Sequence, residues 1–178
     1  MIKYIAIILT ASTVLVSCSP RLEPITEDLI EEYNFDDRAL KNIQYYLSSD
    51  IVLYRSLSDG ESIIENGRVT LKNGKKVEEI VFRAGTPGVY VFSPKDNTLA
   101  ISFEEGKGKY LIFGPIKDRR GHYRLLAKQW NKNYGIVNYD GQAYRTPAAS
   151  AYAELVIDLK AQNQVVRKKK EVSGRTVN

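Results

Sequence analysis

The sequence is poor in the residues that most often carry catalysis or bind metals. Its 178 residues include one cysteine, one histidine, one tryptophan and one methionine. A single cysteine excludes an intramolecular disulfide, and a single histidine leaves too few of the nitrogen and sulfur ligands that zinc sites use. We therefore expect no metal site and no cofactor. No Gly-x-Ser-x-Gly segment is present to supply a serine nucleophile for His122, so we expect this histidine in a surface turn that enters a strand.

Long apolar runs are also absent. The longest apolar or small-residue run, residues 5–16, is shorter than the roughly 20 residues with which a helix crosses a bilayer. It follows the positive charge of Lys3 and ends in small residues, which is the pattern of a secretory signal peptide. The cysteine closes this segment in the order Leu15-Val16-Ser17-Cys18.

These four residues resemble the lipobox of bacterial lipoproteins, in which an aliphatic, a variable and a small residue precede an obligatory cysteine. The resemblance covers residues 1–18 and implies that Cys18 receives a diacylglycerol and that residues 1–17 are removed. Two or three acyl chains hold a protein stably on a membrane, so a membrane is the first expected partner. Ser19 follows the cysteine where inner-membrane lipoproteins carry aspartate. We expect an outer-membrane protein that faces the periplasm, and display on the cell surface stays open.

The net charge of +5 is concentrated at the C-terminus. Residues 165–178 carry a net charge of +4, mostly in the run Arg167, Lys168, Lys169 and Lys170, whereas residues 18–164 hold twenty basic and twenty acidic residues. A neutral domain lacks the basic face that nucleic-acid binding requires, so no nucleic acid is expected as a partner. The run can attract anionic lipids or cell-wall polymers, and a solvated tail without function is an equally good interpretation.

Hydrophobic periodicity predicts a mainly β protein with two short N-terminal helices. Residues 26–33 and 37–47 have helical spacing, and alternation of period two begins near residue 50. Asn-Gly and Asp-Gly pairs between the alternating segments favour hairpin turns. These patterns favour an antiparallel sandwich or a small barrel. The predicted strands are 51–57, 68–72, 76–83, 88–93, 98–104, 109–114, 122–130, 134–139, 142–146 and 151–159.

The same patterns divide the chain into four parts. Residues 1–17 are the signal peptide and residues 18–25 a tether that contains two prolines. A single β-rich domain with N-terminal helices is expected over residues 26–160. Residues 161–178 lose the periodicity and gain charge, so a basic, flexible tail is expected there.

Carboxylates occur in neighbouring pairs at Glu78-Glu79 and Glu104-Glu105. Neighbours in a strand point to opposite faces, so neither pair is expected to converge on a substrate, and a solvated face is favoured for both. Carboxylates from separate strands can still meet in one cleft, as in a glycoside hydrolase.

Trp130 and Tyr134 lie among amides and lysines at the end of a predicted strand. These two side chains could stack on a sugar or anchor a protein partner. The alternative is that Trp130 closes one end of the core.

The sequence therefore predicts a lipid-anchored, non-catalytic envelope lipoprotein. We expect it to be a structural or accessory component of a multiprotein cell-envelope assembly, such as a secretion apparatus. A glycan-binding or small-ligand-binding lipoprotein is the alternative, and a carboxylate-based hydrolase is the least favoured hypothesis.

Overall fold

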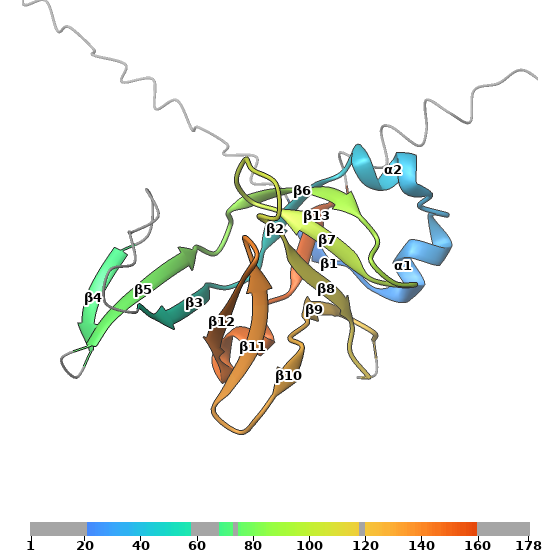
Figure 1. Cartoon of the computed structure of the whole chain (residues 1–178). Helices are drawn as coiled ribbons and strands as arrows, with labels where there is room; N and C mark the ends of the chain where they lie inside the picture. Colours follow the sequence, from blue (N-terminus) through green and yellow to red (C-terminus); the bar gives the residue numbers. More distant parts are fainter. Residues whose placement is uncertain (1–20, 58–67, 73–74, 118–119, 160–178) are drawn as a thin grey trace, which may run out of the picture.

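The strands form two antiparallel sheets. The computed structural model describes residues 21–57, 68–72, 75–117 and 120–159. One sheet has seven strands in the order β1-β13-β2-β6-β7-β8-β9, and the other has six in the order β10-β11-β12-β3-β5-β4 (Figure 1). The strands are β1 (Leu22–Pro24), β2 (Gln44–Leu47), β3 (Ile51–Ser56), β4 (Arg68–Lys72), β5 (Lys75–Phe82), β6 (Pro87–Phe92), β7 (Leu99–Ser102), β8 (Leu111–Pro115), β9 (Tyr123–Leu125), β10 (Gln129–Trp130), β11 (Tyr134–Tyr139), β12 (Gln142–Pro147) and β13 (Leu155–Asp158). The helices are α1 (Glu27–Glu32), α2 (Asp37–Lys41) and the 3₁₀ helix η1 (Ala148–Tyr152).

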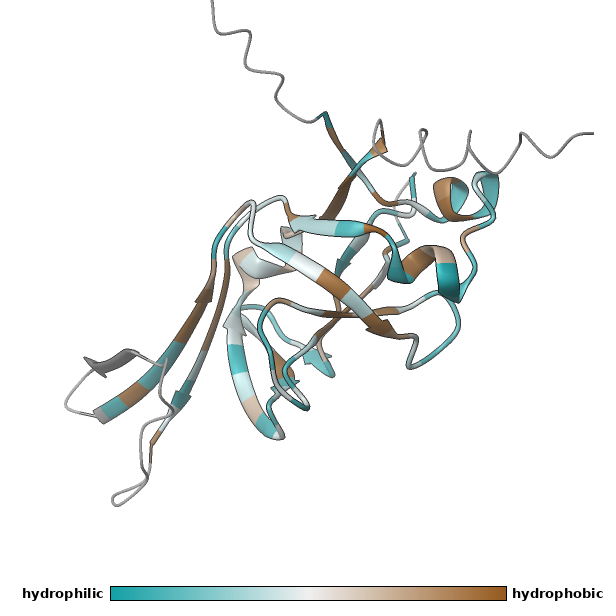
Figure 2. Ribbon diagram, turned by 90° about the horizontal axis from the view of Figure 1, so that it is seen from above, coloured by the Kyte–Doolittle hydropathy of each residue, from teal (hydrophilic) through white to brown (hydrophobic). Residues whose placement is uncertain are grey.

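The predicted fold class is confirmed: the chain is mainly β, its sheets are antiparallel, and two short α-helices lie near the N-terminus. The described strands form no closed barrel. The two sheets share one hydrophobic core, as in a β-sandwich. In Figure 2 most of the hydrophobic residues lie along the strands, and the connecting loops are mainly hydrophilic.

Aromatic rings join the two sheets across this core. The Phe103 ring, which follows β7 of the seven-stranded sheet, lies 5.7 Å from the Phe82 ring of β5 in the other sheet. Phe103 also contacts Phe113 of β8, with ring centroids 6.2 Å apart. Phe82 in turn packs edge-on against Tyr139 of β11 at 5.4 Å. Aromatic pairs in such geometries contribute about 0.5–1.5 kcal/mol beyond the area they bury.

The second predicted helix was wrong beyond residue 41. The helix begins at the cap residue Asp36, whose side chain accepts a hydrogen bond from the backbone of Ala39, and it ends at Lys41. Residues 44–47 then form β2, where Tyr45 and Leu47 are buried. The apolar positions in this segment fit both a helix and an alternating strand, and pairing with β13 and β6 decides for the strand.

The predicted tether overlaps the first strand. β1 pairs with β13, with Leu22 opposite Asp158 and Pro24 opposite Val156. Pro24 is tolerated because β1 is an edge strand, and the next residue, Ile25, belongs to the buried core. Residues 22–25 are therefore part of the folded domain.

Most of the predicted strand boundaries shift by one or two residues, and two predicted strands differ more from the structure. The segment 122–130 contains β9 in the seven-stranded sheet and β10 in the six-stranded sheet. The chain crosses between the sheets in this segment, and residues 126–128 separate the two strands. Likewise, the first residues of the segment 151–159 end the 3₁₀ helix η1, and β13 starts only at Leu155.

The β11–β12 hairpin follows its turn signal. Asp140 and Gly141 both have positive φ angles, of 49° and 72°, as the predicted two-residue hairpin turn requires. β12 pairs on its other side with β3, and among the described residues the register records one position, Arg145 opposite Tyr54. The six-stranded sheet therefore consists of two ladders, β10-β11-β12 and β3-β5-β4, which lie side by side along β12 and β3 and share one recorded register position.

Candidate functional site

The residues of the predicted anchor and basic run lie outside the described residues. This applies to Cys18, Arg167, Lys168, Lys169 and Lys170, and their roles stay predictions. The described ends of the chain nevertheless lie side by side, because Leu22 of β1 pairs with Asp158 of β13. The segments that carry the predicted anchor and the predicted tail therefore leave the domain from the same edge of the seven-stranded sheet.

The two aromatic candidates do not form one surface. Trp130 pairs with Gly135, and a side chain at Gly135 would meet the Trp130 ring at 2.6 Å, so this ring lies directly across the glycine. Tyr134 precedes that glycine and points to the opposite face of the hairpin. Its ring packs under the guanidinium of Arg145, 4.8 Å from the ring centroid. Trp130 remains 36% exposed, so it partly covers the hairpin and partly faces solvent.

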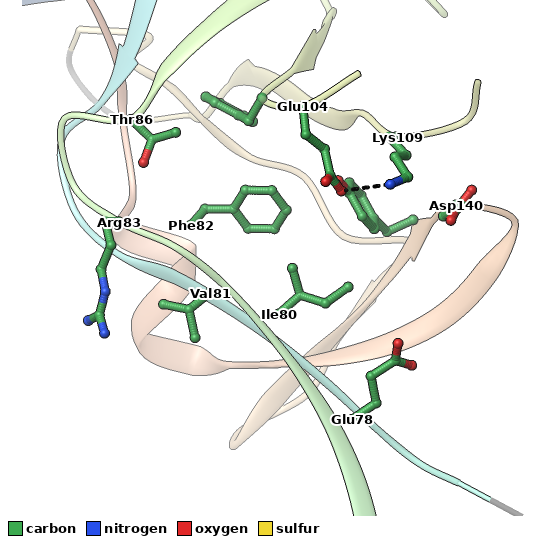
Figure 3. Close-up of a pocket in the computed structure, with 11 residues that line it drawn as sticks. Glu78, Ile80, Val81, Phe82, Arg83, Thr86, Glu104, Lys109 and Asp140 are labelled. Carbon is green, nitrogen blue, oxygen red and sulfur yellow. Dashed lines mark hydrogen bonds and ion pairs between the residues drawn. The ribbon is translucent and has the colours of Figure 1, made fainter. Parts of the chain in front are cut away.

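A cavity of about 250 Å³ opens where the two sheets meet. Its walls come from β5, from the end of β11 and from the segment between β7 and β8 (Figure 3). Figure 3 shows the Phe82 side chain pointing into the middle of the site, with Glu104 and Lys109 on one side and Glu78 on another. The cavity therefore combines an aromatic wall with several ionisable groups.

Glu78 is one of the residues that line this cavity, and it is fully buried, with 0% exposure. Its Oε2 accepts hydrogen bonds from the Arg55 guanidinium and from the Tyr144 hydroxyl, the latter at 3.1 Å. Its Oε1 is buried and has no hydrogen-bond partner. An unsatisfied buried acceptor costs about 1–3 kcal/mol, so this oxygen is the least satisfied group lining the cavity.

Glu104 lines the cavity on a different side of Phe82 from Glu78 (Figure 3). It accepts a hydrogen bond from the Tyr139 hydroxyl, and Lys109 Nζ lies 3.4 Å from its Oε1. Burial, followed by the hydrogen bond to Glu104 and the charge of that carboxylate, raises the pKa of Tyr139 far above its ordinary value. Tyr139 therefore keeps its proton and acts as a hydrogen-bond donor.

The expectation of a solvated face was wrong for Glu78, which is fully buried. It was only partly right for Glu104, whose side chain is 32% exposed. The members of each neighbouring pair do diverge, since Glu79 and Glu105 do not line the cavity. However, Glu78 of β5 and Glu104 of the segment between β7 and β8 line the same cavity. A signal for the burial was present in the alternation, because Glu78 shares the core-facing phase of Ile80 and Phe82.

The expectation that His122 lies in a surface turn was wrong. Its side chain is mostly buried, and its Nδ1 lies 3.0 Å from Oε1 of Glu154. Arg124 donates to the same oxygen through Nε at 2.9 Å and Nη2 at 2.7 Å. This cluster joins the end of the seven-stranded sheet to the segment before β13, and it is separate from the cavity.

The comparisons with known proteins found no match to this chain among family models, curated proteins or solved structures. Within the described ranges, no helix has the length and hydrophobicity to cross a bilayer. In the same ranges, no three His, Cys, Asp or Glu side chains are grouped as a metal site would need.

Removal of Arg55 should destabilise the fold, because the buried carboxylate of Glu78 would lose its cationic partner. We expect Arg55→Met to lower the free energy of unfolding by about 3–5 kcal/mol, because a buried carboxylate loses its cation. The double variant Arg55→Met/Glu78→Leu should regain most of that loss, since the charge is removed as well. Urea denaturation measures both values. An equally large loss in the single and double variants would show that Arg55 acts through packing alone.

The His122–Glu154–Arg124 cluster should make stability depend on acid pH. Burial would raise the pKa of Glu154, but the hydrogen bonds and charges of His122 and Arg124 hold it below its ordinary value of 4.5. A folded-state pKa below the unfolded value stabilises the fold above about pH 4.5, and this contribution is lost as the pH falls through the folded value. We expect the gap in Tm between the unmodified protein and Glu154→Gln to narrow from pH 6 to pH 3.

The control for this pH series is Glu32→Gln, which removes an exposed carboxylate from α1. Its Tm should stay within about 2 °C of the unmodified protein at both pH values. A Glu154→Gln gap that keeps the same size across the series would contradict the linkage.

Proposed function

We propose that the chain is a lipid-anchored, non-catalytic envelope protein that works by binding protein partners within a multiprotein assembly of the cell envelope. The observation that carries this proposal is the lipobox-like segment that ends four residues before β1. Four residues span at most about 14 Å. Acyl chains on Cys18 would therefore hold the folded domain against the outer membrane, on its periplasmic face, with almost no free linker.

The position of the second chain end supports the same orientation. Because Leu22 and Asp158 are paired, the basic run that starts at Arg167 follows only nine residues after the strand that lies beside the anchor. Each basic residue near an anionic surface contributes about 1 kcal/mol of attraction. The tail would add an electrostatic contact with anionic lipids or cell-wall polymers next to the acyl anchor.

An exposed apolar row on β6 supports the binding of a protein partner. Val89, Val91 and Phe92 expose 53%, 43% and 38% of their surfaces. The register with β7 shifts at Val91, so Val89 and Phe92 lie opposite Ser102 and Ala100, which share one face of β7. Neighbouring exposed hydrophobic residues of this kind are typical of protein-binding surfaces.

The cavity between the sheets favours the binding of a small ligand as a second function. It is concave, lined by aromatic rings and supplied with a few ionisable groups, as ligand sites usually are. A carboxylate-based hydrolase is less well supported. Its general acid must hold a proton during the reaction, whereas Glu78 and Glu104 each contact a basic side chain.

Lipidation is tested by replacing the one cysteine. Cys18→Ala should abolish incorporation of labelled fatty acid and leave a precursor that keeps residues 1–17, because the acceptor thiol is gone. Ser17→Ala is the matched control, since it keeps a small residue before the cysteine and should still be labelled. Labelling and membrane fractionation measure both, and labelling that persists in Cys18→Ala would refute the anchor.

Partner binding is tested by photo-cross-linking in intact cells. A photoreactive residue at Val89 or at Phe92 should capture the same protein in high yield, because both side chains are exposed on β6 and lie opposite one face of β7. The same residue at exposed Gln142, on the other sheet, is the control and should not capture that protein. Mild-detergent purification and mass spectrometry identify the product. No product, or identical products from all three positions, would remove β6 as the partner surface.

A further inference from the structure

We propose that the cavity between the sheets binds a small organic cation, an amine carried on a single apolar ring or a body of similar size. This inference rests on the second function above, ligand binding, and names the chemistry of the ligand. It is independent of the lipid anchor and of the β6 surface. Three features of the cavity support a cation: its size, its aromatic wall and the excess of acceptors among its polar groups.

The volume suits a compact ligand. The cavity measures about 250 Å³, and a cavity of about 150 Å³ is enough to hold benzene. One ring with a short substituent therefore matches the space.

The wall provides faces for both the ring and the cationic group. Phe82, Phe103 and Tyr139 line the cavity, with Phe82 packed against each of the other two. Aromatic faces bind apolar rings by packing and attract ammonium groups through their negative π-surface. Ile80 completes the apolar part of the lining.

The polar groups leave acceptors without donors. Glu104 is already engaged by Lys109 and Tyr139. By contrast, Glu78 Oε1 is buried without a partner, and the Asp140 side chain at the rim has no hydrogen bond or ion pair among the described residues. The guanidinium of Arg83, the other basic group of the lining, pairs with Asp50 and is largely exposed. A positive charge on the ligand therefore complements Asp140 directly and lies close to the buried negative charge of Glu78.

The charge and the acceptors of the lining favour a cation over an anion or a neutral ligand. An anion would lie beside the unpaired Asp140 carboxylate and near the buried carboxylate of Glu78, which is repulsive. A hydroxyl supplies one neutral donor, whereas an ammonium supplies three charged donors. Hydrogen bonds between charged groups are about twice as strong as neutral ones, so an amine should bind more tightly than an alcohol of the same shape.

The test uses benzylamine and benzyl alcohol, which have the same number of heavy atoms and differ in charge. Each probe is titrated into the isotope-labelled full chain at pH 7, and backbone amide shifts are followed by NMR. We expect benzylamine to shift the amides of Ile80, Phe82 and Tyr139 with a Kd of about 1 mM, as expected for a small fragment. Benzyl alcohol should shift the same amides with a Kd about tenfold higher.

Asp140→Asn provides the variant, with Glu105→Gln as its matched control. Asparagine tolerates the positive φ of this turn position, so Asp140→Asn removes the charge while the hairpin is kept. Benzylamine should bind this variant about tenfold more weakly, whereas benzyl alcohol binding should stay unchanged. Glu105→Gln removes the same charge from an exposed position outside the cavity, and both affinities should stay within about twofold of the unmodified protein.

The outcomes separate the ligand class from ligand binding itself. Equal affinities for the amine and the alcohol would refute the preference for a cation and would leave a site for a neutral ligand. Shifts confined to amides outside the cavity, or no shifts at 20-fold the expected Kd, would refute both the cation and the second function. Equal weakening in Asp140→Asn and Glu105→Gln would show long-range charge attraction and overturn the role of Asp140.

Discussion

The packing of aromatic rings between the two sheets is the interaction on which the rest of the structure depends. Phe82 contacts Phe103 and Tyr139, so one side chain of β5 is bound to both sheets. The chain crosses between the sheets after β2, β5, β9 and β12, so each sheet contains early and late segments. Segments of one sheet therefore alternate along the chain with segments of the other. The same rings line the cavity, which means that the candidate site is a product of the sandwich packing rather than of any one loop.

Glu78 is the exception within this apolar packing. A charged residue in a core normally destabilises the fold unless its hydrogen bonds are satisfied, and here one oxygen is satisfied by Arg55 and Tyr144 while the other is not. Residues that break the local hydrophobic pattern without full compensation tend to lie at functional sites. The position of Glu78 in the lining of the cavity agrees with that tendency.

Much of the fold could be predicted from the sequence because strand alternation and turn chemistry are local. The strand at 51–57 and the Asp140-Gly141 hairpin turn were both predicted correctly. Prediction failed at residues 42–47, where the spacing of Ile43 and Leu47 fits a helix as well as a strand and only distant partners decide. The site was harder to foresee. Glu78 meets Arg55 across a strand pair, and the cavity needs segments near residues 80, 104 and 139 to meet. No local pattern contains that information.

The single paired position between β12 and β3 has a consequence for how the walls of the cavity are joined. Arg145 opposite Tyr54 is the only recorded ladder position between the two parts of the six-stranded sheet within the described residues. Phe82 belongs to β5 in one part, and Tyr139 ends β11 in the other. The edge-on contact between the Phe82 and Tyr139 rings therefore joins the two parts inside the cavity, where no continuous backbone ladder does so.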